Sequence, residues 1–400
     1  IKWTFDISRL FQELGSLEGL EDSCTCDDEE WNKKNKYSLV GARKNTFWFR
    51  VFSFFTVLFG LILVGAFLSG KSTGREKKFQ YAPGFVYPPA GDLQYPTCSL
   101  RYNFTVSSDA KTSLVDFAFL SGIAYASPDI MTEELSNWFM DENHINHKEV
   151  INSFRDEYEM NNLISAVEFI FIGFPDQDLG IVSIRGTLSL MDTLVDIQLW
   201  TGSFLSRIFR YALPGGELLT PLFLRMINII AYIESGIIQQ ISFYQETTAF
   251  MQFLKEKNMY SNLALTGHSL GGGLAMITAA QTQIPAITIS SPNALLSRGT
   301  FGPTPVTESG LAKYTFNVIP NRDIVPLMDD ASQNFQKINC RSPMNKPHQC
   351  HLPQWAICEL LYTCGSYGRP IPCYCVSRVG YDEPDPIKND GKTFSQICSE

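Results

Sequence analysis

The chain has 400 residues, 44% of them hydrophobic and 18% charged, and its formal net charge is −9 at pH 7. This length accommodates one large domain of roughly 250–300 residues together with accessory segments. The excess of 41 acidic over 32 basic residues argues against a nucleic acid as partner. The sequence does not begin with methionine, so Ile1 need not be the true N-terminus.

The first 70 residues combine a polar region with a hydrophobic segment. Residues 1–46 are polar and rich in acidic side chains, and we expect them to be flexible and cytosolic. Residues 51–70 carry no charge, and about 20 helical residues match a hydrocarbon layer of ~30 Å. Aromatic side chains at 47–49 precede them, as at a membrane interface. A cleaved signal peptide is the alternative, but about fifty residues come before the segment. We therefore expect one transmembrane helix, a signal anchor, at residues 47–70.

The orientation of this helix is indicated by charge, cysteines and a glycosylation sequon. Six basic residues within residues 33–50 precede the uncharged segment 51–70 and four follow it within residues 71–78, which weakly favours a cytosolic N-terminus. Eight of the ten cysteines follow it, which is typical of a disulfide framework in an oxidising compartment, although the sequence does not give their pairing. Asn103 opens a sequon on the same side and is the expected glycosylation site. We therefore expect a type II single-pass membrane protein whose larger part is lumenal (secretory pathway, vacuole or lysosome) or extracellular.

The rest of the chain divides into a linker, a domain and a tail. Residues 71–109 are the expected linker, and residues 366–400 are an irregular, Cys-rich tail. Between them, residues 110–365 alternate helical and strand-like patterns, which predicts an α/β fold with a doubly wound, mostly parallel sheet and flanking helices. The expected helices span 114–126, 148–163 and 227–257, and the expected strands span 167–174, 180–185, 263–266, 286–290 and 314–319.

A candidate nucleophile lies in the sequence Gly267-His268-Ser269-Leu270-Gly271, between a strand-like run and a helix-prone one. A strand that turns sharply into a helix at G-x-S-x-G lifts one serine hydroxyl above the sheet, and here that serine is Ser269. A Cβ at Gly267 or Gly271 would collide with the tightly turned backbone. The alternative is a glycine-rich turn before a buried helix, because short patterns recur by chance.

The candidate acid is Asp323. In this arrangement the acid and the base follow the serine in that order along the chain. Asp323 comes just after the strand-like run 314–319, and open α/β sheets place functional groups at the ends of their strands. Asp329 and Asp330 are alternative acids, in a loop with no strand leading directly into them.

The candidate base is one of two histidines, because only His348 and His351 follow Asp323. We favour His351, since a disulfide at the adjacent Cys350 would fix its loop, and His348 is the alternative. A zinc site formed by Cys340, His348, Cys350 and His351 is a competing interpretation with irregular ligand spacing. We expect no metal.

The run 180–185 ends at Gly186-Thr187 and suggests an oxyanion hole. A tetrahedral intermediate needs two preorganised donors, one after the nucleophile and one in an earlier strand-to-helix loop. The candidates are the N–H groups of Leu270 and Thr187. The following residues 188–209 are unusually apolar and are either a core helix or a lid that opens toward lipid.

These motifs resemble those of the class 3 lipases, an α/β-hydrolase family. The resemblance covers roughly residues 110–365 and is carried by residues 267–272, 184–187, 190–196 and 323–326. Residues 290–297 are most similar to the diacylglycerol lipase branch, and residues 350–365 are similar to protozoan lipases of this class.

The resemblance implies an acylglycerol lipase that cleaves ester-linked acyl chains through an acyl-enzyme, with Ser269, Asp323 and His351 and without any cofactor. Its partner is then a lipid at a membrane or lipid–water interface. A phospholipase in a vacuolar or lysosomal lumen is the alternative, and an inactive lipase-fold binding protein is another. Head group, acyl chain and oligomeric state are left open.

Overall fold

The computed structural model describes residues 112–158, 167–186 and 243–384, except residues 141, 303, 333 and 367, together with residues 200, 203, 207 and 393–399. The expected N-terminal region, the membrane segment at 47–70 and the linker lie outside these residues. Within the described part of the chain, no helix is long and apolar enough to cross a membrane.

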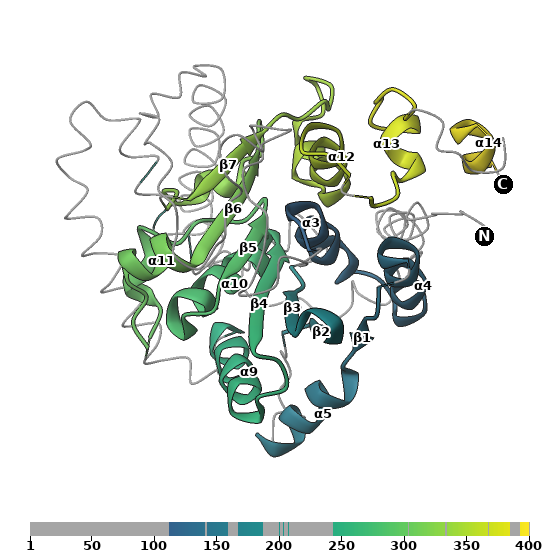
Figure 1. Ribbon diagram of the computed structural model, residues 1–400. Helices are drawn as coiled ribbons and strands as arrows, with labels where there is room; N and C mark the ends of the chain where they lie inside the picture. Colours follow the sequence, from purple (N-terminus) through teal and green to yellow (C-terminus); the bar gives the residue numbers. More distant parts are fainter. Residues whose placement is uncertain are drawn as a thin grey trace, which may run out of the picture.

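Within these described residues, seven strands form one sheet, and they follow one another across the sheet in chain order from β1 to β7 (Figure 1). Strands β1 to β3 pair antiparallel, and β3 to β7 pair parallel. The strands are β1 (Ile145–Asn146), β2 (Phe169–Phe174), β3 (Leu179–Ile184), β4 (Asn262–His268), β5 (Ala286–Ile289), β6 (Thr315–Pro320) and β7 (Phe335–Ile338).

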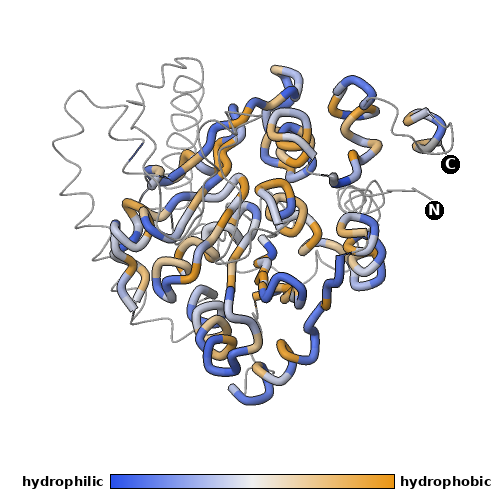
Figure 2. The backbone as a smooth tube through the Cα atoms, viewed as in Figure 1, coloured by the Kyte–Doolittle hydropathy of each residue, from blue (hydrophilic) through white to orange (hydrophobic). Residues whose placement is uncertain are grey.

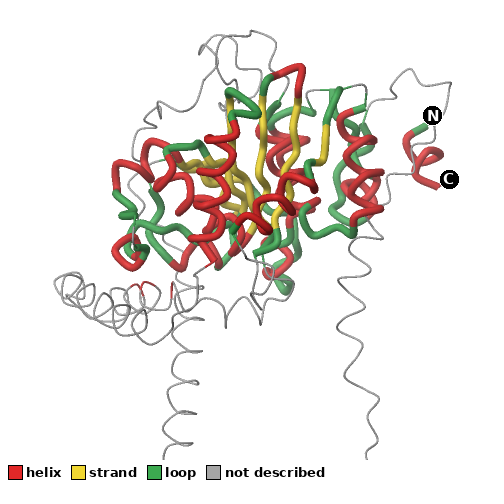
Figure 3. The backbone as a smooth tube through the Cα atoms, turned by 90° about the horizontal axis from the view of Figure 1, so that it is seen from below, coloured by secondary structure: helices red, strands yellow, loops and turns green. Residues whose placement is uncertain are grey.

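Helices lie on both sides of the sheet (Figure 3). The α-helices are α3 (Leu114–Ile123), α4 (Pro128–Phe139), α5 (Lys148–Glu157), α9 (Phe243–Lys257), α10 (Ser269–Thr282), α11 (Glu308–Tyr314), α12 (Pro353–Thr363), α13 (Cys373–Ser377) and α14 (Phe394–Ser399). Short 3-10 helices are η5 (Pro175–Gln177), η6 (Ser297–Thr300), η7 (Val325–Met328) and η8 (Pro347–His351).

The predicted α/β fold is present, but the strand order does not reverse as it does in a doubly wound sheet. Parallel connections are almost always right-handed, so α9, α10 and α11 all pack on one face. The other face is covered by α3 and α4, which precede the parallel strands, and by α12 and α13, which follow them. The second helical layer therefore comes from the two ends of the domain.

The alternation of side chains along the strands explains the two apolar cores. In β4, Ala264 belongs to the core beneath α3 and α12, whereas Leu263 and Leu265 belong to the core beneath α9 and α10. Figure 2 shows hydrophobic residues gathered along the strands and on the facing sides of the helices. With both faces covered, the central strands are buried throughout, which is the pattern of a parallel sheet.

Residues beyond α12 are attached to the domain by a buried ion pair and disulfides. Arg369 bonds Asp116 of α3 at 2.7 Å and Glu142 at 2.7 Å. The disulfide Cys358–Cys375 joins α12 to α13, and Cys373–Cys398 joins α13 to α14. Cys364 is disulfide-bonded as well. The predicted framework of disulfides in this part of the chain is thus present.

Candidate functional site

The turn between β4 and α10 presents Ser269 as the first residue of the helix. Ser269 has a φ of +55°, a value that is uncommon and costly for a residue with a side chain. A Cβ on Gly267 would lie 2.6 Å from the carbonyl carbon of Gly271, and one on Gly271 would lie 2.2 Å from the oxygen of Ile184. The glycines are therefore required by close backbone approach, as the motif predicted.

The structure brings Ser269, His351 and Asp323 together, from three segments of the chain. Nε2 of His351 lies 2.9 Å from Oγ of Ser269, and Nδ1 lies 3.1 Å from each carboxylate oxygen of Asp323. A carboxylate only accepts, so the proton of the neutral imidazole is assigned to Nδ1, and Nε2 is left to accept the proton of the serine hydroxyl. The side chains are buried, which strengthens these interactions. The alternative base His348 is solvent-exposed in η8.

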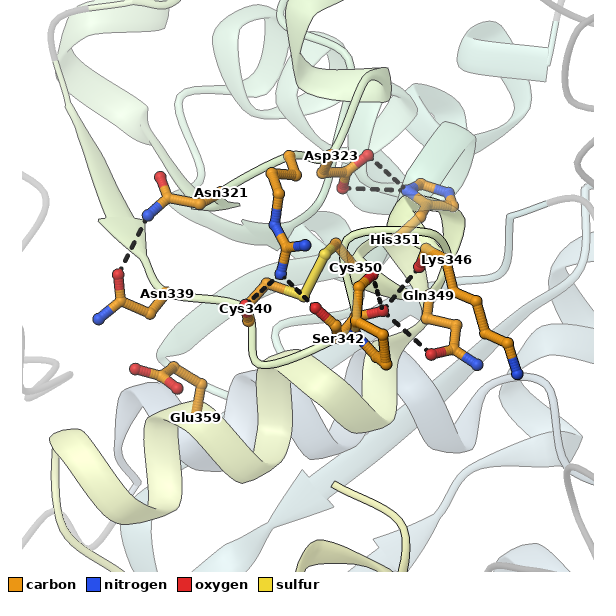
Figure 4. The surroundings of a disulfide bond; sticks show 12 residues. Asn321, Asp323, Asn339, Cys340, Ser342, Lys346, Gln349, Cys350, His351 and Glu359 are labelled. Carbon is orange, nitrogen blue, oxygen red and sulfur yellow. Dashed lines mark hydrogen bonds and ion pairs between the residues drawn. A yellow bond between two sulfur atoms is a disulfide. The ribbon is translucent and has the colours of Figure 1, made fainter. Parts of the chain in front are cut away.

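A disulfide holds the loop that ends at His351 (Figure 4). Cys340 and Cys350 are bonded to each other, which removes both sulfurs as zinc ligands. The zinc interpretation is therefore wrong. Arg322, next to Asp323, donates to the carbonyl oxygens of Cys340 and Ser342, so the loop of Asp323 is tied to the segment that leads to His351. Across the described residues, no group of three or more His, Cys, Asp or Glu side chains is placed to hold a metal.

The loop of Asp323 is fixed by its own hydrogen bonds. Its Oδ1 accepts from the N–H of Val325 at 3.0 Å. Asn293 donates from Nδ2 to the carbonyl of Pro326 at 2.9 Å. Asp329, an alternative acid, accepts from Leu296 and Ser297 instead of a histidine. Burial raises the pKa of Asp329 to about 6, against the opposing effect of these hydrogen bonds.

Of the two predicted oxyanion donors, Leu270 lies among the described residues and Thr187 does not. Leu270 is the second residue of α10, and amides of the first helical turn have no acceptor within their helix. Its N–H also lies at the positive end of the helix dipole, beside Ser269. Thr187 lies outside the described residues. Its neighbour Gly186 lies against the elbow, since a Cβ there would be 2.7 Å from the carbonyl oxygen of His268.

Three described residues of the apolar segment 188–209 pack against the loops after β5 and β6. Trp200 is buried and donates from Nε1 to the carbonyl of Asn293 at 2.6 Å. Ser203 is buried, and Arg207 lies 3.4 Å from a carboxylate oxygen of Asp330. These contacts join the segment to the loop of Asp323. Its remaining residues, and with them the choice between core helix and lid, lie outside the described part, as does Asn103.

Two residues with no assigned role in the sequence analysis adjoin this site. His268 donates or accepts at both ring nitrogens: Nε2 lies 2.6 Å from the carbonyl oxygen of His351, and Nδ1 lies 3.1 Å from the hydroxyl of Tyr125. Burial lowers the pKa of His268 to about 3, with a further lowering from the charge of His351. His268 could have been noticed as a histidine inside the elbow, whereas nothing in the sequence around Tyr125 indicated this contact.

The family model "Lipase (class 3)" matches residues 181–331, and no curated protein matches significantly. The Lip2 lipase from Yarrowia lipolytica is 17% identical, with 57% of this chain and 78% of that chain covered and a TM-score of 0.28. The Rhizomucor miehei lipase in its propeptide complex is 14% identical, with 74% and 93% covered and a TM-score of 0.31. M37 lipase is 17% identical, with 65% and 83% covered and a TM-score of 0.28.

The family match carries the assignment, and the structural likenesses at these scores add nothing to it. The matched residues 181–331 include the end of β3, the elbow with Ser269, and Asp323, whereas His351 lies beyond them. They contain most of β3, all of β4 and the turn that presents Ser269. Residues 181–331 therefore match the class 3 lipase family, and this match supports a carboxylic ester hydrolase.

Proposed function

We propose that this protein is an acylglycerol lipase that uses Ser269, His351 and Asp323 as a catalytic triad. The observation that carries the proposal is the continuous chain of hydrogen bonds from Oγ of Ser269 through the imidazole of His351 to the carboxylate of Asp323. A serine hydroxyl is a weak nucleophile until an adjacent base accepts its proton, and this arrangement supplies such a base.

The proposed reaction has two steps. Oγ of Ser269 attacks the ester carbonyl while Nε2 of His351 takes its proton, and the same proton then passes to the departing alcohol. Water hydrolyses the acyl-enzyme with His351 again as base, releasing the fatty acid and restoring the serine. Asp323 keeps Nδ1 protonated and stabilises the imidazolium, and the N–H groups of Leu270 and Thr187 would bind the oxyanion.

Exposed apolar side chains near the acid support a lipid as substrate. Ile324 is 41% exposed and follows Asp323 directly in the chain, and Leu327, three residues further on, is 54% exposed. Met344 is 75% exposed and its sulfur lies 3.3 Å from Arg322, so it adjoins the same loop. Clustered exposed apolar residues are typical of surfaces that contact lipid or protein. A lipid surface would cover them while the ester reaches Ser269.

We further propose that the enzyme is anchored as a type II membrane protein by residues 47–70, with the hydrolase lumenal or extracellular. The apolar, uncharged sequence of residues 51–70 supports the anchor. Three disulfides, Cys340–Cys350, Cys358–Cys375 and Cys373–Cys398, support an oxidising compartment. Asn103 would then carry a glycan.

The test of the catalytic proposal is covalent labelling of the full chain with a fluorophosphonate probe, beside hydrolysis of acylglycerol emulsions. The wild type should be labelled and active, and Ser269→Ala should lose both properties. The exposed Ser309 of α11 offers a matched control, because Ser309→Ala should keep both. A labelled Ser269→Ala variant would show that another residue is the nucleophile. A wild-type protein that neither reacts nor hydrolyses any ester would favour a lipid-binding role instead.

Mixed phospholipid and acylglycerol substrates, compared between wild type and Ser269→Ala, would identify the head group.

A further inference from the structure

We propose that His268 and Tyr125 are positioning residues that hold the base His351 against Ser269 through the main-chain carbonyl of His351. The proposal rests on the catalytic role given above to Ser269 and His351. It is carried by three linked contacts: His268 Nε2 to the carbonyl oxygen of His351 at 2.6 Å, His268 Nδ1 to the Tyr125 hydroxyl at 3.1 Å, and the N–H of Gly186 to that hydroxyl at 3.1 Å.

The donors and acceptors in these groups fix the direction of each of the three hydrogen bonds. A carbonyl oxygen only accepts, so Nε2 of His268 carries the proton and donates it to His351. In the neutral ring Nδ1 is then unprotonated and accepts from the hydroxyl of Tyr125. That hydroxyl in turn accepts from the N–H of Gly186. The other acceptor within reach of the hydroxyl, the carbonyl oxygen of His268, is farther away at 3.4 Å. Every donor in this series of hydrogen bonds therefore has an acceptor.

The surroundings keep His268 neutral, as this direction requires. The residue is buried, and burial lowers the pKa of its imidazole to about 3. The ring centroids of His268 and His351 are 4.8 Å apart. Since His351 becomes positively charged when it takes the proton of Ser269, a charged neighbour at this distance would oppose catalysis. A neutral donor fixes the backbone of His351 without that repulsion.

The position of the accepted carbonyl explains why this contact bears on catalysis. His351 is the last residue of η8, and the disulfide Cys340–Cys350 restrains the backbone on its N-terminal side. The hydrogen bond from His268 restrains the same residue at its own carbonyl. The contacts with Asp323 set the rotation of the ring, while these two restraints set where the ring is attached. A displacement of about 1 Å in such a group can lower a rate by roughly a hundredfold.

The series of hydrogen bonds also reaches Gly186, the residue before Thr187 in the sequence. Tyr125 comes from the turn after α3, yet its hydroxyl receives the N–H of Gly186 at the end of β3. A Cβ on Gly186 would lie 2.4 Å from that hydroxyl, so the backbone approaches it as closely as only glycine allows. One hydrogen-bonded chain thus links the elbow, the base and the strand end that precedes the proposed oxyanion donor.

The test separates the rate of Ser269 labelling from the fraction of molecules that become labelled. His268→Phe keeps a ring and removes both nitrogens, and His268→Gln restores a donor toward His351. Tyr125→Phe removes only the hydroxyl. Its matched control is Tyr244→Phe, because the buried Tyr244 hydroxyl also bonds a glycine backbone, at Gly302, without touching the triad. The probe is a fluorophosphonate, applied to the full-length variants, with kcat and KM measured on a short-chain ester.

We expect His268→Phe to be labelled roughly a hundredfold more slowly yet to the wild-type endpoint, with kcat reduced and KM unchanged. The labelling rate of Tyr125→Phe should be about tenfold lower than that of the wild type, and Tyr244→Phe should be labelled at the wild-type rate. His268→Gln should recover most of the lost rate. An unchanged labelling rate in His268→Phe would overturn the proposal. A reduced endpoint at an unchanged rate would overturn it as well, since that result marks a purely structural residue.

A second measurement keeps this proposal distinct from the assignment of the nucleophile. Nitrogen-15 NMR of the histidine rings in the wild type should show His268 neutral and protonated at Nε2 between pH 5 and 8, and Tyr125→Phe should shift its Nδ1 resonance. This result does not depend on labelling at Ser269. Protonation at Nδ1 instead would overturn the hydrogen-bond chain even in an active enzyme. If the hydrogen-bond chain is found but Ser269→Ala retains full activity, the catalytic assignment fails and the positioning role fails with it.

Discussion

At the scale of single residues, the site is built from side chains that are each held by the backbone in an uncommon way. Ser269 has a positive φ that its glycine neighbours make possible, and His351 lies between a disulfide and a hydrogen-bonded carbonyl. The positive φ of Ser269 costs stability. Together these restraints place the proposed reacting groups before any substrate arrives. The geometry leaves no role at the triad for His348, which is exposed.

The two histidines therefore give a direct prediction. His351→Ala should lower kcat by several orders of magnitude, about as much as Ser269→Ala, because members of a triad act as a unit. His348→Ala, three residues earlier in the same loop, should stay within about threefold of the wild type, since an exposed surface substitution away from the triad usually has little effect. Steady-state kinetics on one ester substrate would measure both. Equal and severe losses in the two variants would point instead to a shared structural role.

At the scale of elements, the sequence predicted the parts of the fold that have a long apolar pattern. The strand runs at 263–266, 286–290 and 314–319 correspond to β4, β5 and β6, because these central strands are buried on both faces. The edge strands β1 and β7 went unpredicted, since β1 has two residues and β7 is only partly buried. The helix expected at 114–126 ends at Ile123, and α4 was missed because its few apolar residues are interspersed with polar ones.

The candidate site also contains features that the sequence could predict and features that it could not. Ser269, Asp323 and His351 could be chosen as candidates because a motif, a strand end and the small number of histidines each restrict the choice, and the structure brings these three side chains together. The pairing of Cys340 with Cys350 could not, since eight cysteines allow too many combinations. The bond between Tyr125 and His268 joins residues 143 apart, and only the folded chain brings them together.

The disulfide-closed loop before His351 provides the prediction at this scale. Cys350→Ser should reduce kcat, because the loss of the bond to Cys340 frees the backbone on the N-terminal side of the base. Cys340→Ser should have the same effect, and the double variant should be no worse than either single one. Cys398→Ser is the matched control, since it opens the bond to Cys373 between α13 and α14. Comparable kcat values for Cys350→Ser and Cys398→Ser, with both proteins folded, would contradict the role of the loop.

At the scale of the whole molecule, one buried carboxyl links stability to pH. Burial raises the pKa of Asp329 to about 6, so the folded state binds its proton more tightly than the unfolded state does. Stability from this group is then complete below about pH 4 and is lost as the pH rises through about 6, a change on the order of 3 kcal/mol. Urea unfolding of wild type and Asp329→Asn between pH 4 and 8 would measure it. The free energy of unfolding of the wild type should exceed that of the variant by less as the pH rises. If the two free energies changed in parallel with pH, the burial argument would be contradicted.

The disulfides and the sequon also lead to a prediction about membrane topology. If residues 47–70 anchor the chain with its hydrolase domain in the lumen, Asn103 should carry a glycan, because the transferase acts only on that side. Peptide-N-glycosidase should then shift the mobility of the wild type and leave Asn103→Gln unchanged. In sealed microsomes, an added protease should remove only the residues before the anchor and spare the domain with Cys340–Cys350. Digestion of everything after Gly70 would show a cytosolic domain, and an oxidising compartment could then no longer account for the disulfides Cys340–Cys350, Cys358–Cys375 and Cys373–Cys398.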